Sequence, residues 1–200
     1  MLSEQLPLAH RMQPKLQLSM AHTQEEVREA QRLRYRVFVE EMGARPTCRE
    51  AGIDSDMYDP YCDHLLVRDR DSGEVVGTYR MLTTAKAKEI GGFYSENEFD
   101  LTRLVYVKER MVELGRSCVH PDFRSGAVIA MLWDGLAKYM LLHRAEYLMG
   151  CASLSISDGG HVAASLYHRL KASHMSPIEW RVLPRVPLPL EHLEHGLEAV

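Results

Sequence analysis

The spacing of apolar residues predicts a strand and then a long helix in the first part of the chain. Apolar and polar residues alternate over residues 15–20, which is typical of a strand with one buried face. Thr23 begins a helix, and Glu26 lies three residues later, where it completes a capping box. Gly43 and Pro46 end this helix.

Two further strands, over residues 64–70 and 75–83, are joined by the turn sequence Asp71-Ser72-Gly73 and predict a hairpin. Residues 84–112 show no clear period, so we expect a long irregular loop. Because such loops are uncommon inside compact domains unless they carry function, this segment is a candidate part of a functional site.

The second half of the chain alternates strands and helices. Strands are predicted over residues 112–119, 147–152 and 180–183, and helices over residues 125–143 and 161–171. The first of these helices is apolar around most of its circumference, so it should be largely buried. A length of 200 residues is typical of one domain. We therefore expect residues 1–200 to form a single α/β domain with helices on a mixed sheet.

The charged residues are distributed unevenly. The net charge of −4 argues against a nucleic-acid-binding protein. Residues 41–63 hold six acids and two bases, whereas residues 101–185 hold eleven bases and seven acids. The sequence therefore predicts an acidic loop beside a basic half. For any single charge, a solvated surface is the simpler interpretation.

The cysteines and histidines predict no metal site. The four cysteines show no CxxC spacing, and the ten histidines show no HExxH motif. The chain has no apolar run long enough to span a membrane, and its first residues have none fit for a signal peptide. We therefore expect a cytoplasmic protein with reduced thiols, in which Cys118 and Cys151 are core residues.

The transition from strand to helix at residues 113–140 predicts a phosphate site. His120-Pro121-Asp122 ends the strand, and Arg124-Ser125-Gly126 begins the helix. Free backbone N–H groups and the helix dipole attract an anion at such a start. Arg124 adds a positive charge, and Gly126 lets the backbone come close. On spacing alone, an ordinary helix start is the simpler alternative.

This strand, turn and helix resemble the acyl-donor site of the GNAT N-acyltransferase superfamily. Ala164-Ser165-Leu166-Tyr167 resembles a later helix of the superfamily, whose tyrosine often protonates the departing thiolate. Coenzyme A enzymes favour a second small residue after the glycine, but Ala127-Val128-Ile129 follows here. The resemblance therefore implies no bound cofactor and a donor with one phosphate, the 4′-phosphopantetheine of acyl carrier protein. The residues implied to contact this arm are Ser117, Cys118, Val119, Arg124, Ser125 and Gly126.

Other runs resemble two families of enzymes that take acyl groups from acyl carrier protein. One family is the acyl-homoserine-lactone synthases. Their motif residues are resembled, in order and approximate spacing, by Arg34-x-x-x-Phe38, Asp54-x-Asp56-x-x-Asp59, Arg80 and Glu113-x-x-Arg116. The ornithine-lipid N-acyltransferases, often labelled hemolysin-like, are resembled by RLRYRVFVEE (32–41), GGFYSENEFDLTRL (91–104) and ELGRSCVHPDFRSGAV (113–128). Members of that family usually continue with a segment rich in Gly, Leu, Arg and Asp, so the resemblance implies that this segment is missing.

The resemblance implies an enzyme that moves a 3-hydroxyacyl chain from acyl carrier protein to the α-amine of L-ornithine and gives lyso-ornithine lipid. Its partners would be acyl carrier protein, a small amino acid and, through the lipid product, the periphery of the inner membrane. Two alternatives stay open: an autoinducer synthase or other N-acyl amino acid synthase, and a non-catalytic hemolysin-type protein. Lactone synthases usually carry a tryptophan shortly after the first helix, whereas the tryptophans here are Trp133 and Trp180.

The implied reaction gives roles to the charged residues. An amine must lose a proton before it attacks a thioester, and Glu113 is the candidate base, with Arg116 beside it. The alternative is a structural ion pair of Glu113 with Arg116 or Arg80. We expect the cationic substrate to be held by Asp54, Asp56, Asp59 and Arg80.

The remaining roles fall to the backbone and to the two later helices. Backbone N–H groups of the 113–119 strand are expected to hold the oxyanion where the strand diverges from residues 147–152. Tyr167 is either the proton donor or an ordinary helix aromatic. Cys118 is disfavoured as an acyl-carrying nucleophile, because no histidine is placed to activate it. Acyl carrier protein is acidic. We expect it to dock on bases that flank the cleft at the predicted phosphate site, namely Arg144, Arg169 and Lys171.

Overall fold

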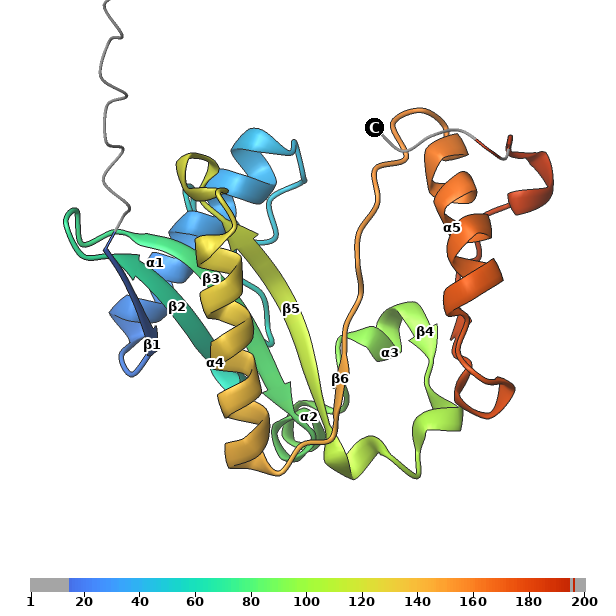
Figure 1. Cartoon of the computed structure of the whole chain (residues 1–200), viewed down its shortest axis with the longest axis horizontal. Helices are drawn as coiled ribbons and strands as arrows, with labels where there is room; N and C mark the ends of the chain where they lie inside the picture. The colour runs from blue at the N-terminus through green and yellow to red at the C-terminus, as the bar shows by residue number, and fades with distance from the viewer. Residues whose placement is uncertain (1–14, 195, 197–200) are drawn as a thin grey trace, which may run out of the picture.

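The computed structural model describes residues 15–194 and residue 196. A mixed sheet of five strands lies at its centre, in the order β1-β2-β3-β5-β6 (Figure 1). The strands β1 (Leu16–Met20), β2 (Asp63–Asp69), β3 (Val75–Thr83) and β5 (Met111–Val119) are antiparallel neighbours. The last strand, β6 (Tyr147–Met149), runs parallel to β5. The predicted α/β class with a mixed sheet is confirmed, and so is the hairpin of β2 and β3.

A long helix covers each face of this sheet. α1 (Gln24–Tyr35) packs on one face and α4 (Ala127–His143) on the other. The predicted capping box is present: the Glu26 N–H donates to Thr23 Oγ1 at 3.2 Å, and the Thr23 N–H donates to Glu26 Oε2 at 3.0 Å. After α1 the chain continues as a π-helical turn over Arg36–Glu41, which the sequence pattern does not indicate.

The two faces of the sheet have separate apolar cores. Burial of each aliphatic side chain contributes about 1.5–3 kcal/mol. The core beneath α4 includes Leu65, Val67, Met81, Leu114, Val128, Leu132 and Leu136. The core beneath α1 is smaller and consists of Ala30, Leu33, Val37, Leu66, Val75 and Cys118.

A β-bulge at Arg116 changes the face to which the residues of β5 point. Between two paired positions β3 has one residue, whereas β5 has two, Arg116 and Ser117. Arg116 has a φ of 51°, in the left-handed region that residues other than glycine rarely adopt. Leu114 therefore packs toward α4, whereas Cys118, four residues later, packs toward α1.

The expectation that α4 is largely buried is wrong. Its inner side is buried at Val128, Leu132 and Leu136. Among the described residues nothing covers the outer side, where Trp133 is 51% exposed and Leu141 is 81% exposed. The apolar composition of α4 therefore exceeds what the sheet face alone can bury.

The segment predicted as an irregular loop is structured. It contains α2 (Thr84–Ile90), α3 (Ser95–Glu98) and β4 (Phe99–Asp100). β4 pairs with β7 (Leu183–Pro184), outside the main sheet. The last predicted strand is wrong over most of its length, because residues 178–180 form a 3₁₀ turn and Pro184 lacks an N–H for a longer ladder. Further 3₁₀ turns lie at Asp59–Tyr61, Thr102–Leu104, Lys108–Arg110, Pro121–Phe123 and Leu190–His192.

The last helix, α5 (His161–His174), lies apart from the main sheet (Figure 1). β6 is shorter than predicted, and after it residues 150–156 run to α5 without regular structure. The C-terminal segment holds the start of α5, since the Glu194 N–H donates to His161 Nδ1 at 3.0 Å. None of the described helices could cross a membrane.

The four cysteines are free, but they differ in burial. Cys118 is buried beneath α1, as expected. Cys151 is exposed, so its prediction as a core residue is wrong. The physical reason is that β6 ends at Met149, before the chain reaches this cysteine.

Candidate active site

A buried ion-pair network lies on the α1 side of the sheet and fixes the acidic loop. Arg34, on α1, is 1% exposed. Its Nε donates to Asp54 Oδ2 at 2.7 Å, and its Nη1 and Nη2 donate to the two oxygens of Asp59 at 2.8 and 3.0 Å. Asp54 and Asp59 are also buried, and bidentate arginine–carboxylate pairs of this kind hold a fixed geometry.

Two further arginines extend the network from the sheet. Arg80, on β3, donates through Nη1 to Asp56 at 2.6 Å and to Asp59 at 2.9 Å. Arg116, at the β5 bulge, lies 3.6 Å from Asp54 and 3.5 Å from Asp56 and sits over the ring of Phe38. The π-helical turn after α1 carries Phe38, so this turn supports Arg116.

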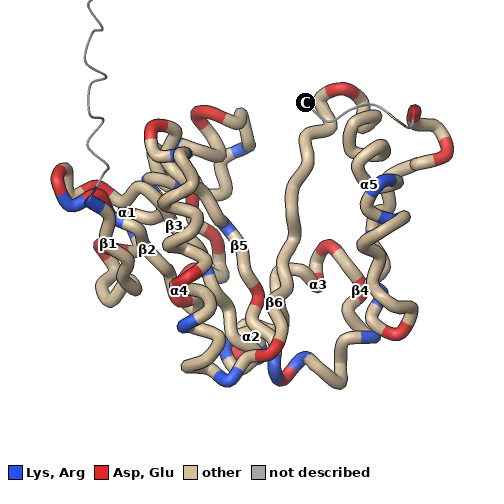
Figure 2. The backbone as a smooth tube through the Cα atoms, viewed as in Figure 1, with Lys and Arg blue, Asp and Glu red and all other residues tan. Residues whose placement is uncertain are grey.

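The network neutralises most of the acidic loop. Arg34, Arg80 and Arg116 offset Asp54, Asp56 and Asp59, so the predicted acidic patch is a balanced cluster in the fold. Along the backbone, positions of both signs occur in the sheet and in the segments beside it (Figure 2). Burial disfavours the charged form of Asp59, but the guanidinium groups of Arg34 and Arg80 outweigh it and hold its pKa well below the ordinary value. Burial lowers the pKa of His64, which lies beneath this cluster, despite the nearby Asp59.

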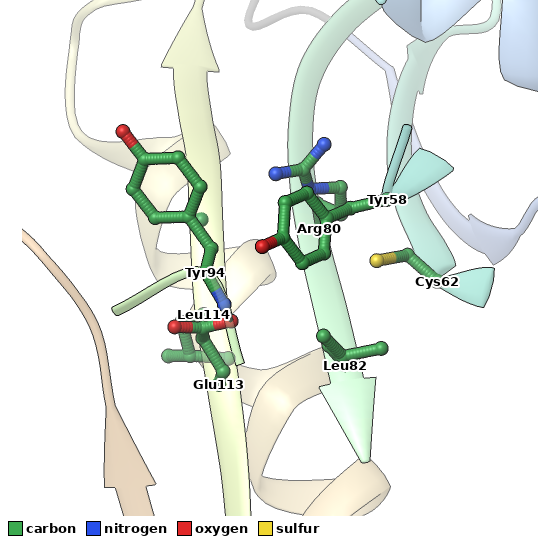
Figure 3. A pocket seen from close by; sticks show the side chains of 8 residues that line it. Tyr58, Cys62, Arg80, Leu82, Tyr94, Glu113 and Leu114 are labelled. Atoms are coloured by element: carbon green, nitrogen blue, oxygen red, sulfur yellow. Dashed lines mark hydrogen bonds between the residues drawn. The ribbon is translucent and has the colours of Figure 1, made fainter. Parts of the chain in front are cut away.

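A small cleft opens beside this network, between β3 and β5. Figure 3 shows Tyr58, Arg80, Tyr94 and Glu113 converging on it from two strands and two loops. Its floor is Gly115, where a Cβ atom would lie 3.9 Å from both Nε and Nη2 of Arg80. The remaining lining residues are Cys62, Leu82 and Leu114.

Glu113 grips the backbone of the 91–98 segment. Its Oε2 accepts the Tyr94 N–H at 2.8 Å, and its Oε1 accepts the Ser95 N–H at 2.6 Å. Neither of the ion pairs weighed for it, with Arg80 or with Arg116, is present among the described residues. Glu113 is 5% exposed but lines the cleft, so its remaining lone pairs can reach a substrate there.

The strands β5 and β6 diverge as expected. Their pairing ends at Glu113–Met149, although β5 continues to Val119. Gly150, just after β6, still lies close to β5, since a Cβ atom there would be 2.5 Å from the carbonyl oxygen of Leu114. Beyond it, the edge of β5 carries backbone groups without a partner strand.

The phosphate site at the start of α4 stays a prediction, and the positive charge that Arg124 would bring to it is compensated. Gly126 has a φ of 98° and precedes Ala127, and no side chain caps the helix. Arg124 donates two hydrogen bonds to Glu41, at 2.6 and 2.7 Å, so it contributes no free positive charge. Ser117 and Val119 are half-buried on β5. Burial raises the pKa of the Cys118 thiol to about 12, which is unfavourable for a nucleophile.

The structure does not bring the predicted residues of α5 to this cleft. The ring of Tyr167 contacts His168 and Lys171, both on its own helix. Arg169 lies on the same helix, apart from the sheet.

Arg144 lies at the wrong end of α4 for the predicted docking surface. It follows the last turn of this 17-residue helix, whereas Arg124 precedes the first turn. At 1.5 Å per residue, the two arginines are separated by roughly 25 Å along the helix axis. The expectation that Arg144 flanks the same cleft as Arg124 is therefore wrong.

Three residues that line the cleft are given no role by the sequence analysis: Tyr58, Tyr94 and Gly115. Tyr58 and Tyr94 form an edge-to-face pair with centroids 5.8 Å apart at the mouth of the cleft. The sequence pattern predicts Gly115 only as a residue of the strand over 112–119. Gly115 lies between Glu113 and Arg116, and the 91–104 run contains Tyr94, so both lay within matched motifs; Tyr58 lies within the acidic loop.

A mixed sheet whose parallel strands diverge beside a helix start, with a charged cleft at that edge, defines an acetyltransferase-type fold. Residues 33–134 match the acetyltransferase (GNAT) domain family. The chain belongs to this family, because the match covers half of its length and includes the acidic loop, β3, β5 and the start of α4.

Solved structures show the same fold. The AHL synthase LasI aligns with a TM-score of 0.53, covering 76% of this chain and 79% of that chain at 18% identity. FeeM, an N-acyl amino acid synthase from uncultured soil microbes, also aligns with a TM-score of 0.53, covering 74% and 77% at 13% identity. At these identities the likeness concerns the fold alone.

Curated proteins named L-ornithine N(alpha)-acyltransferase are similar in sequence. The protein of Rhodobacter capsulatus is 46% identical, over 71% of this chain and 58% of the relative. That of Agrobacterium fabrum is 42% identical, over 92% of this chain and 64% of the relative. The chain thus spans about 58–64% of the length of these relatives.

Proposed function

We propose that this protein is an N-acyltransferase that moves a 3-hydroxyacyl chain from acyl carrier protein to the α-amine of L-ornithine. The observation that carries the proposal is the cleft in which Arg80 and Glu113 lie beside Asp56, at the edge where β5 leaves β6. The similarity to L-ornithine N(alpha)-acyltransferases supports ornithine as the amine. The product is then lyso-ornithine lipid, whose acyl chain would bring the enzyme to the membrane periphery.

Asp56 is the acid best placed to hold the cationic substrate. Asp54 and Asp59 are committed to Arg34, so they position the loop. Asp56 accepts a hydrogen bond from Arg80 through Oδ1, whereas its Oδ2 is buried without a hydrogen bond to any described group, although Arg116 Nη2 lies 3.5 Å away. A substrate ammonium at this oxygen would satisfy it, and a buried unsatisfied acceptor costs about 1–3 kcal/mol.

Glu113 is the proposed base. The α-ammonium of ornithine gives a proton to Glu113, directly or through one water, and the amine nitrogen then attacks the thioester carbonyl carbon. The new C–N bond creates an oxyanion, which free backbone N–H groups on the open edge of β5 would hold. When the intermediate collapses, the C–S bond breaks, and the second proton of the attacking nitrogen passes through solvent to the departing thiolate. Tyr167 would protonate this thiolate only if α5 approached β5.

The proposed donor arm lies along β5 toward the start of α4. The backbone N–H groups at Gly126 and the first turn of α4 would take its single phosphate. Arg124 would have to exchange Glu41 for the phosphate. Arg169 and Lys171 are the bases on α5 that remain for the acidic carrier protein.

A panel of donors and amines tests this function. Purified protein is incubated with 3-hydroxyacyl-acyl carrier protein or the matching acyl-coenzyme A, and with ornithine, homoserine, glycine or S-adenosylmethionine. We expect lyso-ornithine lipid by mass spectrometry, with the carrier-protein donor preferred. A lactone formed from S-adenosylmethionine would instead identify an autoinducer synthase, and no product with any pair would overturn the proposal.

The Asp56→Asn variant tests where the cation binds. Because only the substrate amine is cationic, this change should raise the KM for ornithine by about tenfold and leave the KM for the donor unchanged. Asp71→Asn is the matched control, since Asp71 is an exposed acid in the hairpin turn. Equal changes in both KM values would indicate a displaced loop.

A further inference from the structure

The cleft presents an unused pair of hydrogen-bond donors on Arg80. Its Nη1 is shared between Asp56 and Asp59, whereas Nε and Nη2 have no partner among the described residues. Both nitrogens lie beside Gly115, which lines the cleft together with Arg80. Nε and Nη2 lie on one edge of the guanidinium plane, and such an edge matches the two oxygens of a carboxylate.

The neighbouring residues keep this edge open. Gly115 lies beneath it and contributes no side chain, so the space above the β5 backbone is free next to Nε and Nη2. The guanidinium carbon also lies over the Tyr58 ring, 5.8 Å from its centre. The edge is therefore held in one orientation by Asp56, Asp59 and Tyr58.

Tyr58 supplies a third donor. Its hydroxyl oxygen accepts a hydrogen bond from Asn97 Nδ2 at 2.8 Å, so its own O–H is left to donate elsewhere. No acceptor for this proton occurs in the described part of the chain. Tyr58 and Arg80 line the same cleft (Figure 3).

From this geometry we infer that the Nε/Nη2 edge of Arg80 and the Tyr58 hydroxyl bind the α-carboxylate of the amine substrate. The inference rests on the proposed function and narrows it. The carboxylate lies at Arg80, and the α-ammonium lies toward Glu113 on the opposite wall. Arg80 thus selects α-amino acids with a free carboxylate over simple amines.

The test compares ornithine with putrescine, which is ornithine without its carboxylate, and with ornithinamide, in which the carboxylate is neutral. Wild-type protein should prefer ornithine in kcat/KM by about ten- to a hundredfold, the range for hydrogen bonds to a charged group. Tyr58→Phe should lose about tenfold with ornithine and little with the other two amines.

A second variant probes the arginine without removing a buried charge. Gly115→Ala places a methyl group beside Nε and Nη2 at van der Waals distance, so the protein should fold while the carboxylate is displaced. Its kcat/KM with ornithine should fall toward its value with putrescine. Tyr79→Phe is the matched control, because Tyr79 precedes Arg80 but packs toward Trp133 on the other face.

Equal use of ornithine and putrescine by wild-type protein, or equal losses with all three amines in both variants, would overturn the inference. If no amine is acylated, the proposed function fails, and calorimetric titration still decides the inference. Tighter binding of ornithine than of ornithinamide, abolished by Gly115→Ala and kept in Tyr79→Phe, would support the carboxylate site. Indistinguishable binding of the two ligands would refute it.

Discussion

The two faces of the central sheet are built from the same strands but bury different kinds of side chain. On the face that α4 covers, the strands β2, β3 and β5 contribute aliphatic side chains such as Leu65 and Met81. Beneath α1, the neighbouring residues His64 and Arg80 point into a network of buried charges. Apolar burial is favourable in itself, whereas a buried ion pair roughly breaks even against its cost of desolvation. The charged face therefore holds groups in place for the cleft, and the apolar face supplies the stability that permits it.

The strongest test of this contrast removes one charge from the network. Arg34→Met leaves Asp54 and Asp59 buried without their main cation, and we expect a loss of about 3–5 kcal/mol in the free energy of unfolding. Leu132→Ala, on the apolar face, should cost about 2–5 kcal/mol by creating a cavity. Urea titration followed by circular dichroism measures both.

Rescue separates the two mechanisms. Adding Asp54→Asn and Asp59→Asn to Arg34→Met removes the orphaned charges, so part of the stability should return. No polar change should rescue Leu132→Ala. An Arg34→Met protein within about 1 kcal/mol of wild type would show that the network is not a buried ionic cluster.

Acid should weaken the charged face and spare the apolar one. The pKa of His64 is lowered by burial, so its contribution is complete above its ordinary value of about 6.5 and is lost as pH falls below it. The pKa of Asp59 is lowered by Arg34 and Arg80 despite burial, so its contribution is lost only below about pH 3.9. Urea titrations from pH 8 to pH 3 should show two successive declines.

A His64→Gln variant isolates the first decline. It should flatten the profile between about pH 6.5 and pH 5 and leave the steeper acid loss unchanged. An unaltered slope in this window would mean that another group titrates there.

The pattern of strands was readable from sequence because each face of the sheet buries regular aliphatic side chains. The capping box at Thr23 and Glu26 was readable because its two hydrogen bonds are local. The bulge was not readable, because Arg116 is not a glycine and gives no sign of a left-handed φ. In the folded protein, Arg116 in this conformation contacts Asp54, Asp56 and Phe38, which lie far from it in sequence.

The sequence predicted which residues make up the candidate site better than it predicted their hydrogen-bond partners. The order of the motifs singled out Arg34, the three aspartates, Arg80 and Glu113. In the structure these residues lie together in the ion-pair network and the cleft beside it. The partner of Glu113 could not be predicted, since it is the backbone of Tyr94 and Ser95 and carries no side-chain signature. The position of Arg144 at the far end of α4 from Arg124 could not be predicted, because sequence spacing does not say at which end of a helix a cleft opens.

Glu113→Gln probes the link between the charged face and the cleft. The amide nitrogen cannot accept the backbone N–H that one carboxylate oxygen accepts now, so we expect a loss of about 1–3 kcal/mol in stability as well as reduced turnover. If Glu113 is the base, the rate of the variant should rise with pH as the solution deprotonates the amine. A residue that only grips the backbone would lower kcat equally at every pH.

Glu96→Gln is the matched control for this variant. Glu96 accepts the Phe93 N–H at 2.7 Å, so it holds the same segment without lining the cleft. It should lose comparable stability and keep the wild-type pH profile. A pH-dependent rescue in both variants would point to movement of the segment.

The smallest effect is expected on the outer side of α4, next to a much larger effect on its inner side. Trp133 follows Leu132 in sequence but is half-exposed, and its main contact is an edge-to-face arrangement with Tyr79 at 6.4 Å. Trp133→Ser should therefore cost only the aromatic pair, about 0.5–1.5 kcal/mol, against about 2–5 kcal/mol for Leu132→Ala. If Trp133 contributes only through its contact with Tyr79, the double variant Trp133→Ser/Tyr79→Ala should lose little more stability than Tyr79→Ala alone. A cost for Trp133→Ser as large as that for Leu132→Ala would mean that something covers this side of α4 in solution. The contrast would then lie between two buried faces, and α4 would have a partner that the described residues do not provide.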